Sequence, residues 1–292
     1  MLTIFGIPKP FEGHFGVIQR NAIRSWTQLS PRCQVLLFGD ENGTAQVAAE
    51  VGAQHIPTVE RNEFGTPLLN SVFEQAEGAA THPTLCFVNS DIIFMNDFLP
   101  AVQRVLDKFD RFLLIGRRTT VDITEPLSFA GDWESKLKER TIATGHLDNN
   151  TAIDYFVFRP GLWGKIPPFA IGRPQYDNWL VYQANHSGVP VVELTEVVTV
   201  VHQNHTRAHP AGVDGLRKSP EGQRNLELAG GYTHGHTIWD SKYILTRRSL
   251  RRRRSPYALY RQFVDLVDQH PTLEPALKSV RSVIRFVRGA ET

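Results

Sequence analysis

Short apolar runs alternate with longer amphipathic segments through the first 160 residues of this chain. A short apolar run between turn residues is typical of a buried strand, and a longer segment with apolar residues at helical spacing is typical of a helix. Repetition of the two indicates βα units on a mostly parallel sheet. The sequence therefore predicts an α/β fold with a mostly parallel, Rossmann-type sheet flanked by helices.

The alternation predicts strands at Leu2–Ile7, Gln34–Phe38, Gln54–Ile56, Leu85–Val88, Phe112–Ile115 and Ile153–Phe158. It predicts helices at Val17–Thr27, Thr44–Val51, Pro67–Ala80, Phe98–Phe109 and Trp133–Arg140. In the third of these helices Thr66 is a candidate N-cap and Pro67 would occupy the first position, where a missing N–H costs nothing.

The regular alternation ends near residue 160. We expect a helix at Tyr176–His186, a strand at Val189–Val192, the β-branched run Val197–Val201, a long loop at Gln203–Gly235, and tail helices at Tyr257–Asp268 and Pro275–Val287. Long loops in compact domains are usually binding loops or lids. The loop is therefore predicted to serve the function.

Composition excludes several protein classes. A chain of 292 residues that is 41% hydrophobic fills a core, which excludes disorder and collagen, and it has no apolar run of about 18 residues. The first residues lack a secretory signal, and the two cysteines, Cys33 and Cys86, are too few for a disulfide framework. We expect buried, reduced thiols and a cytoplasmic protein.

Charge is distributed unevenly. Residues 247–292 carry 11 Lys and Arg against 4 Asp and Glu, whereas residues 1–246 carry 21 against 26. The dense cluster Arg247–Arg254 raises a membrane surface or a polyanion as a partner, and we expect no nucleic acid. The alternative is a solvated basic face on a packed helix.

Polar residues follow the predicted strands, at the edge where open α/β sheets bind ligands. Pro8, Lys9 and Pro10 form a stiff loop that could line a base pocket, and Asp40 could accept hydrogen bonds from a ribose or base. The strongest signal is Asn89-Ser90-Asp91, which lies inside an otherwise apolar run.

Asn89 and Asp91 are candidate metal ligands. A carboxylate in apolar surroundings is costly unless a cation or several donors compensate it, and Mg²⁺ and Mn²⁺ prefer oxygen ligands. A metal there could bridge a diphosphate. The alternative is a strand-end turn in which both side chains bond to backbone.

An apolar strand followed by this Asn-Ser-Asp triplet resembles the DxD motif of GT-A glycosyltransferases. Further resemblance, to uncharacterised bacterial and plant members of the nucleotide-diphospho-sugar transferase superfamily, is carried by Ile7–Phe11, Arg61–Pro67, Tyr176–Leu180 and Val201–His205. It covers about residues 1–235. It implies a GT-A-like catalytic domain at 1–246, with a nucleotide half at about 1–116, an acceptor half at about 117–246 and a basic helical extension at 247–292.

The resemblance also implies roles. Asp91 would be the chief ligand of Mn²⁺ or Mg²⁺, assisted by Asn89 and His202, and Asp177 at a helix start would be the base of an inverting reaction. Asp177 could equally be a first-turn carboxylate that favours the helix dipole, and His202 a structural histidine. His205 and His209 follow, without the cysteines or the HExxH motif of a zinc site.

Further residues are assigned to substrate. Arg61, Asn62, Thr66 and Asn70, with Ser90, would bind the nucleotide or diphosphate through an arginine fork and helix N–H groups, or else form a capped surface helix. On the acceptor side, Asp154 would meet a sugar hydroxyl or pair with Arg173, and Asn178 and Trp179 would contact a sugar.

Together these features predict a metal-assisted glycosyltransferase that moves a sugar from a UDP- or GDP-type donor to a glycan or other hydroxyl acceptor. One alternative is a non-catalytic nucleotide or carbohydrate-binding protein. The other is a sugar-nucleotide nucleotidyltransferase, which the missing glycine cluster after the first strand disfavours.

Overall fold

The structure is a computed structural model that describes residues 2–205 and 212–254, together with 257, 260, 263, 264, 267, 271–273 and 275. The chain divides into two compact units, Met1–Arg251 and Arg252–Thr292. In the second unit Val264 and Val267 are buried against Tyr260 and Phe263. Most of the predicted tail helices, Tyr257–Asp268 and Pro275–Val287, and all of His209, lie outside the described residues.

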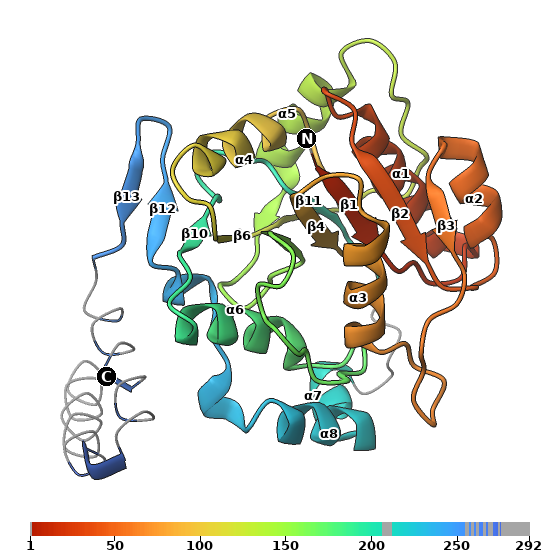
Figure 1. The fold of residues 1–292 in the computed structure, drawn as a ribbon. Helices are drawn as coiled ribbons and strands as arrows, with labels where there is room; N and C mark the ends of the chain where they lie inside the picture. The colour runs from red at the N-terminus through yellow and green to blue at the C-terminus, as the bar shows by residue number, and fades with distance from the viewer. Residues whose placement is uncertain are drawn as a thin grey trace. The chain divides into compact units, whose positions relative to one another are not determined.

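The main sheet has the strand order β13-β12-β10-β6-β9-β4-β1-β2-β3 (Figure 1). Its strands are β1 Thr3–Gly6, β2 Gln34–Phe38, β3 Gln54–Ile56, β4 Leu85–Val88, β6 Leu113–Ile115, β9 Tyr155–Phe158, β10 Val191–Glu193, β12 Tyr243–Leu245 and β13 Leu250–Arg252. β1 runs parallel to β2 and β4, while β9 is antiparallel to both β4 and β6. The predicted α/β fold with a mostly parallel sheet is confirmed.

Helices cover both faces of this sheet. The α-helices of the described residues are α1 Gly13–Gln28, α2 Thr44–Val51, α3 Leu69–Ala79, α4 Phe98–Leu106, α5 Trp133–Thr144, α6 Tyr176–His186, α7 Gly212–Lys218 and α8 Pro220–Leu228, and 3₁₀ turns lie at Tyr232–His234, Ile238–Asp240 and Pro271–Leu273. Side chains alternate along each strand, so neighbouring residues enter different layers. Ile4 of β1 packs with α1, α2 and α4, and its neighbour Phe5 packs with α3 and α6.

A second, smaller sheet has the order β5-β11-β7-β8. Its strands are β5 Ile92–Ile93, β11 Val201–Gln203, β7 Thr119–Val121 and β8 His146–Leu147. Val121 and Val201 pack with Leu137 of α5. Apart from the predicted run Val197–Val201, which overlaps β11 only at Val201, these strands were not predicted, because two or three residues are too short to show a period of two.

Gln203, at the end of β11, joins distant parts of the chain. Its side chain is fully buried. Its side-chain Nε2 donates to the carbonyl of Ile18 at 2.7 Å and to that of Asp91 at 3.1 Å. Its Oε1 accepts from the side-chain amide of Asn21 at 2.9 Å. One residue thereby connects α1, the end of β4 and the small sheet.

The predicted start of the third helix is wrong. α3 begins at Leu69, with Leu68 as N-cap, instead of at Pro67 with Thr66 as cap. Residues 66–68 are held extended because Pro67 bridges to Arg61 and Leu68 bridges to Ala170. Thr66 therefore does not offer helix N–H groups to a ligand.

Two predictions for the later part of the chain also need correction. Of the run Val197–Val201, only Val201 belongs to a strand, so His202 lies within β11 and not after it. The predicted long loop at 203–235 contains α7, α8 and a 3₁₀ turn. Ser219 caps α8 by accepting from the N–H of Gly222, a capping signal that glycine and histidine content had obscured.

Cys33 and Cys86 are buried free thiols, as predicted. Among the described residues, no helix combines the length and the apolar character that crossing a membrane requires.

Candidate active site

The carboxyl ends of three parallel strands carry the main site residues. β1 leads to Lys9, β2 leads to Asp40, and β4 leads to the Asn89–Asp91 turn. The turn is closed by a hydrogen bond from the N–H of Ile92 to the carbonyl of Asn89 at 3.1 Å. Asp91 therefore lies between β4 of the main sheet and β5 of the small sheet.

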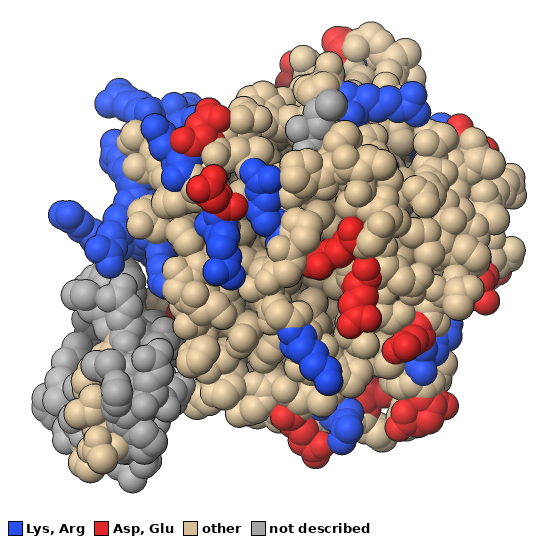
Figure 2. Space-filling view, viewed as in Figure 1, with Lys and Arg blue, Asp and Glu red and all other residues tan. Residues whose placement is uncertain are grey.

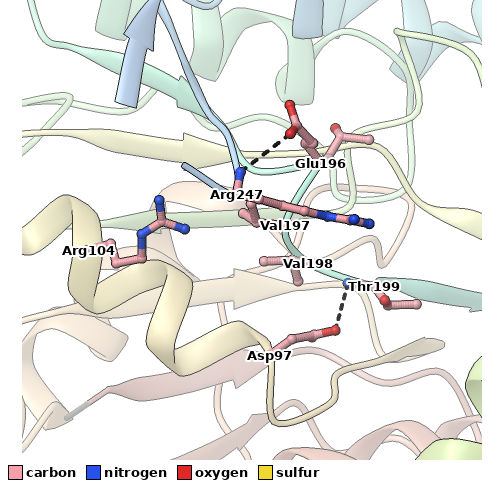
Figure 3. A pocket seen from close by; sticks show the side chains of 8 residues that line it. Asp97, Arg104, Glu196, Val197, Val198, Thr199 and Arg247 are labelled. Carbon is pink, nitrogen blue, oxygen red and sulfur yellow. Dashed lines mark hydrogen bonds between the residues drawn. The ribbon is translucent and has the colours of Figure 1, made fainter. Parts of the chain in front are cut away.

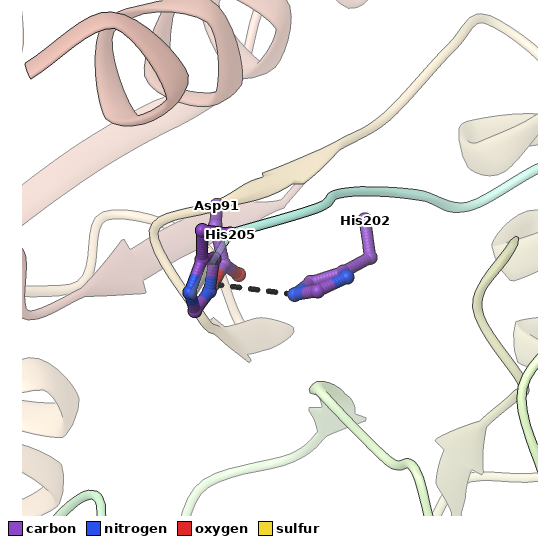
Figure 4. A group of neighbouring side chains, drawn as sticks. All are labelled: Asp91, His202 and His205. Atoms are coloured by element: carbon purple, nitrogen blue, oxygen red, sulfur yellow. Dashed lines mark hydrogen bonds and ion pairs between the residues drawn. The ribbon is translucent and has the colours of Figure 1, made fainter. Parts of the chain in front are cut away.

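Asp91, His202 and His205 form a cluster at this junction (Figure 4). Asp91 Oδ2 lies 3.6 Å from His202 Nε2 and 3.0 Å from His205 Nε2. One potential ligand atom from each residue lies within 4.8 Å of the other two. The site thus combines one carboxylate and two imidazoles.

Strand pairing explains how residues far apart in sequence meet here. His202 pairs with Ile92 of β5 on one side and with Thr120 of β7 on the other. Because β5 begins directly after Asp91, the pairing places His202 beside the carboxylate. His205 follows β11, and its ring lies 5.1 Å from that of Phe15 on α1.

Asp91 is held in its ionised form. Burial alone would raise the pKa of this carboxyl, but hydrogen bonds and charge from His202 and His205 outweigh burial and hold the pKa well below its usual range. Its second oxygen, Oδ1, is buried and has no hydrogen-bond partner among the described residues. An orphaned carboxylate oxygen of this kind is costly without a further cation or donor.

A chain of polar contacts leads away from His202. Its Nδ1 lies 3.0 Å from the Thr120 hydroxyl, which lies 2.9 Å from Asp148 Oδ2. Arg118 joins Asp148 at 2.6 Å and also pairs with Asp154. The alternative that Asp154 pairs with Arg173 is therefore wrong, because Asp154 pairs with Arg118, directly before β7, and Arg173 pairs with Glu221.

Asn89 is directed toward Asp154. Its side-chain nitrogen donates to Asp154 Oδ1 at 2.5 Å, and its backbone N–H donates to the carbonyl of Asp154 at 2.9 Å. These bonds align the β4 turn with the start of β9. The predicted contact of Asn89 with a metal stays a prediction, while its amide nitrogen has a structural partner.

Asp177 lies half-buried in the first turn of α6. Burial and the neighbouring charge of Asp154 raise the pKa of Asp177 to about 6, although N–H groups of the backbone, chiefly that of Asn178, oppose the rise. A carboxyl with such a pKa can exchange a proton near neutral pH. The helix-start position was predicted from the sequence and is confirmed.

Lys9 lies near the cluster. Its backbone is held by Gln19, which accepts from the N–H of Lys9 at 2.6 Å and donates to its carbonyl at 2.9 Å. The ammonium lies 4.5 Å from the centre of the Phe15 ring. Burial lowers the pKa of Lys9, and Asp91 opposes that effect. The flanking Pro8 is buried and Pro10 is exposed.

Arg61 and Asp40 are brought together, but they pair with each other. The guanidinium contacts Asp40 at 2.7 Å and Glu41 at 3.0 Å, and it donates to the carbonyl of Gly65 at 2.9 Å. The Asp40 side chain is 72% exposed, so it is accessible from the surface at the end of β2.

Glu221 of α8 organises a second polar group. It accepts from Asn62 at 2.8 Å and from Arg173 at 2.7 Å, and Arg173 reaches the Thr66 hydroxyl at 3.4 Å. Asn62, Thr66 and Arg173, all predicted site residues, therefore gather around the buried carboxylate of Glu221. The sequence analysis missed Glu221 because it assigned the α8 region to a loop. Asn70 and Ser90 each have a buried oxygen without a hydrogen-bond partner among the described residues.

The two remaining acceptor candidates have structural contacts. Asn178 donates to the carbonyl of His236 at 2.7 Å and accepts from its N–H at 3.1 Å. Trp179 packs against Phe169 in the core and is only 7% exposed. Their contacts with a sugar stay predictions.

The donor set fits a divalent cation. Asp91 offers an ionised carboxylate with an orphaned oxygen, and His202 and His205 offer imidazole nitrogens within ligand range of each other. Mn²⁺ accepts such mixed ligands, whereas Mg²⁺ prefers oxygen alone. His205 is the member that the sequence analysis did not assign; the spacing His202-x-x-His205 was its only signal.

A separate hollow of about 400 Å³ lies between α4 and residues 195–199 (Figure 3). Arg104 and Arg247 line it together with Asp97 and Glu196, so its charges are mixed. It contains none of the predicted site residues.

The sequence matches no protein-family model and no curated protein. Its fold does match solved structures. Glucosyl-3-phosphoglycerate synthase of M. tuberculosis is 16% identical, with a TM-score of 0.50, over 79% of this chain and 81% of that one. TarS of S. aureus, residues 1–349 with UDP-GlcNAc, is 12% identical, with a TM-score of 0.48, over 78% and 70%. The chain therefore has a GT-A-like fold, a mostly parallel sheet flanked by helices, like that of glucosyl-3-phosphoglycerate synthase.

Proposed function

We propose that this protein is a glycosyltransferase that moves a sugar from a nucleoside-diphosphate donor to a hydroxyl acceptor, with a divalent cation at Asp91, His202 and His205. The observation that carries the proposal is the cluster itself, one carboxylate and two imidazoles at the carboxyl end of β4 in a GT-A-like fold. Open α/β sheets bind ligands at that edge.

A cation bound there would supply Lewis-acid neutralisation of the diphosphate leaving group. The chain's own residues do the rest. Lys9, whose ammonium lies 4.5 Å from the centre of the Phe15 ring and interacts electrostatically with Asp91, would offer a second positive charge toward the departing diphosphate. Asp40, which is exposed at the end of β2 and pairs with Arg61, would accept hydrogen bonds from a ribose or base.

Asp177 is the base in the inverting form of the reaction. The anomeric carbon loses its bond to the diphosphate oxygen and gains a bond to the acceptor oxygen, and the acceptor proton passes to the Asp177 carboxylate. A pKa of about 6 suits this step, because the group is ionised at neutral pH yet still basic enough to take a proton.

Calorimetric titration of UDP and GDP tests the donor site, each with Mn²⁺, with Mg²⁺ and with EDTA. We expect one nucleotide to bind in Mn²⁺, more weakly in Mg²⁺ and not in EDTA. Asp91→Asn removes the charge that holds the cation and should weaken binding on the order of a hundredfold. Asp110→Asn, an exposed carboxylate on the loop after α4, is the matched control and should bind as the wild type does.

Binding of neither nucleotide under any of these conditions would overturn the proposal. Metal-dependent binding of a nucleotide without release of nucleoside diphosphate, across a panel of hydroxyl acceptors, would identify a binding protein and overturn the catalytic part alone.

A further inference from the structure

Thr120 lies between a candidate metal ligand and an ionised carboxylate. Its hydroxyl is 3.0 Å from His202 Nδ1 and 2.9 Å from Asp148 Oδ2. Register fixes this arrangement, because Thr120 pairs with His202 across β7 and β11 and with His146 across β7 and β8, two residues before Asp148. The three groups therefore form one line across the small sheet.

The direction of the hydrogen bonds can be worked out from the donors available. Arg118 has only donors, and its Nε lies 2.6 Å from Asp148 Oδ2, so Asp148 is a carboxylate that only accepts. A threonine hydroxyl has one hydrogen. A bond to an ionised acceptor is stronger than one to a neutral nitrogen, so the Thr120 hydrogen points to Asp148.

The remaining Thr120 lone pair then faces His202 Nδ1. Only a hydrogen on Nδ1 makes that 3.0 Å contact favourable. In the neutral ring Nε2 is then without a hydrogen, and its lone pair faces Asp91 Oδ2 at 3.6 Å. A lone pair opposite a carboxylate oxygen is unfavourable, so this contact needs a positive charge between the two atoms, either a proton on Nε2 or a bound metal ion in its place.

We propose that Thr120 and Asp148 are positioning residues that hold His202 as the Nδ1–H tautomer and thereby present its Nε2 to a divalent cation of the Mn²⁺ type. The proposal rests on the cation site of the proposed function, but it does not depend on sugar transfer. Arg118 anchors the line by joining Asp148 to Asp154, so the contacts extend from the cation site to the start of β9.

Histidine ¹⁵N NMR reads the tautomer directly. The His202 signals are assigned by their loss in His202→Gln, and spectra are recorded on metal-free protein at about pH 9, where imidazole is neutral, and on protein with Zn²⁺ as a diamagnetic probe. We expect hydrogen on Nδ1 in both states and a Zn²⁺-induced shift of Nε2. Hydrogen on Nε2, or a mixture of the two tautomers in the wild type, would overturn the proposal.

Titration with Mn²⁺ alone, without nucleotide, measures what the positioning contributes. Removing the partner of a metal-binding imidazole typically weakens metal binding by about 10- to 100-fold, and we expect that loss in Thr120→Val. Thr120→Ser keeps the hydroxyl and should restore wild-type binding.

Thr119→Val is the matched control. It makes the same change one residue earlier on β7, and among the described residues the Thr119 hydroxyl has no hydrogen-bond partner. Equal Mn²⁺ binding by Thr120→Val and Thr119→Val would overturn the positioning role. A wild type that binds no Mn²⁺ would overturn the cation site, and the tautomer in metal-free protein would then still decide the role of Thr120. A wild type that binds Mn²⁺ but transfers no sugar would count against the proposed function alone.

Discussion

The surroundings of Asp177 destabilise the charged form of its carboxyl group. Burial and Asp154 raise the pKa of Asp177 to about 6, from an ordinary value of 3.8. The folded protein therefore holds this proton more tightly than the unfolded chain does. Stability falls as pH rises from about 4 to about 6 and stays lower above that range, by about 3 kcal/mol at most for a shift of roughly two units.

Asp177→Asn should therefore have opposite effects on stability and activity. At about pH 8 it removes a buried charge and should raise the free energy of unfolding by up to about 3 kcal/mol, whereas at about pH 4 it should change little. Loss of a general base typically lowers turnover by about 10²- to 10⁴-fold. Urea unfolding at both pH values and initial rates of nucleoside diphosphate release measure the two effects.

A rise in stability with unchanged turnover would show that Asp177 is only a first-turn carboxylate. In the wild type the same assignment predicts that turnover falls as pH decreases through about 6, because the base becomes protonated. A flat rate between about pH 5 and pH 8 would contradict it.

At the scale of single residues, the sequence pointed to two members of the Asp91, His202 and His205 cluster but not to the contacts that hold them. Asp91 and His202 follow from an acid in an apolar run and from a histidine beside a β-branched run. His205 and Glu221 do not, because their roles depend on contacts across more than a hundred residues of sequence. The local sequence pattern cannot show that Asp154 pairs with Arg118 and not with Arg173.

The close contact of β1 and β4 beside Asp91 gives a prediction for an element. A Cβ at Gly6 would lie 2.7 Å from the carbonyl oxygen of Val88 and 3.2 Å from Ser90 Oγ. Gly6→Ala should push the β4 turn away from β1, cost about 1–3 kcal/mol of stability and weaken Mn²⁺ binding. Thermal unfolding and calorimetry with Mn²⁺ alone check both effects.

Gly78→Ala is the opposite control. Gly78 lies near the end of α3, and a Cβ there meets no heavy atom within 4 Å. Alanine favours the helix by up to about 1 kcal/mol, so this variant should be slightly more stable and should bind Mn²⁺ unchanged. If Gly6→Ala behaved like Gly78→Ala, the close approach of β1 and β4 would not control the site.

Several elements of the main sheet and its helices were predictable, whereas the strands of the small sheet were not. β2, β3, β4, α2 and α6 have the predicted bounds, because each combines a clear apolar pattern with turn residues at its ends. The strands of the small sheet have two or three residues, and their pairing is set by tertiary contacts. Pro67 misled the helix assignment because a proline suits a strand bridge as well as a first helical turn.

On the whole molecule, basic side chains gather over the region of β12 and β13 (Figure 2). Arg247, Arg248 and Arg251 are exposed there. We expect Arg251–Arg254 to attract anionic surfaces, since each basic residue near such a surface contributes about 1 kcal/mol. Replacing all four by Ser in the full chain should weaken sedimentation with phosphatidylglycerol vesicles on the order of a hundredfold or more.

A control must separate the loss of this cluster from the loss of four positive charges. It replaces four exposed basic residues elsewhere, namely Arg24, Arg32, Lys108 and Arg111. That variant should sediment nearly as well as the wild type at about 0.1 M salt. Equal behaviour of the two variants, or sedimentation with phosphatidylcholine vesicles alone, would indicate that the cluster is an ordinary solvated surface.

The buried contacts of Gln203 have a consequence for how the chain folds during its synthesis on the ribosome. Until residue 203 has been synthesised, Asn21 and the carbonyl of Ile18 lack their partner, and β4 lacks its neighbour β9 until residue 158. Contacts so distant in sequence form slowly and late. The same event brings His202 and His205 to Asp91, so a nascent chain can assemble this cluster only after residue 205 has been synthesised.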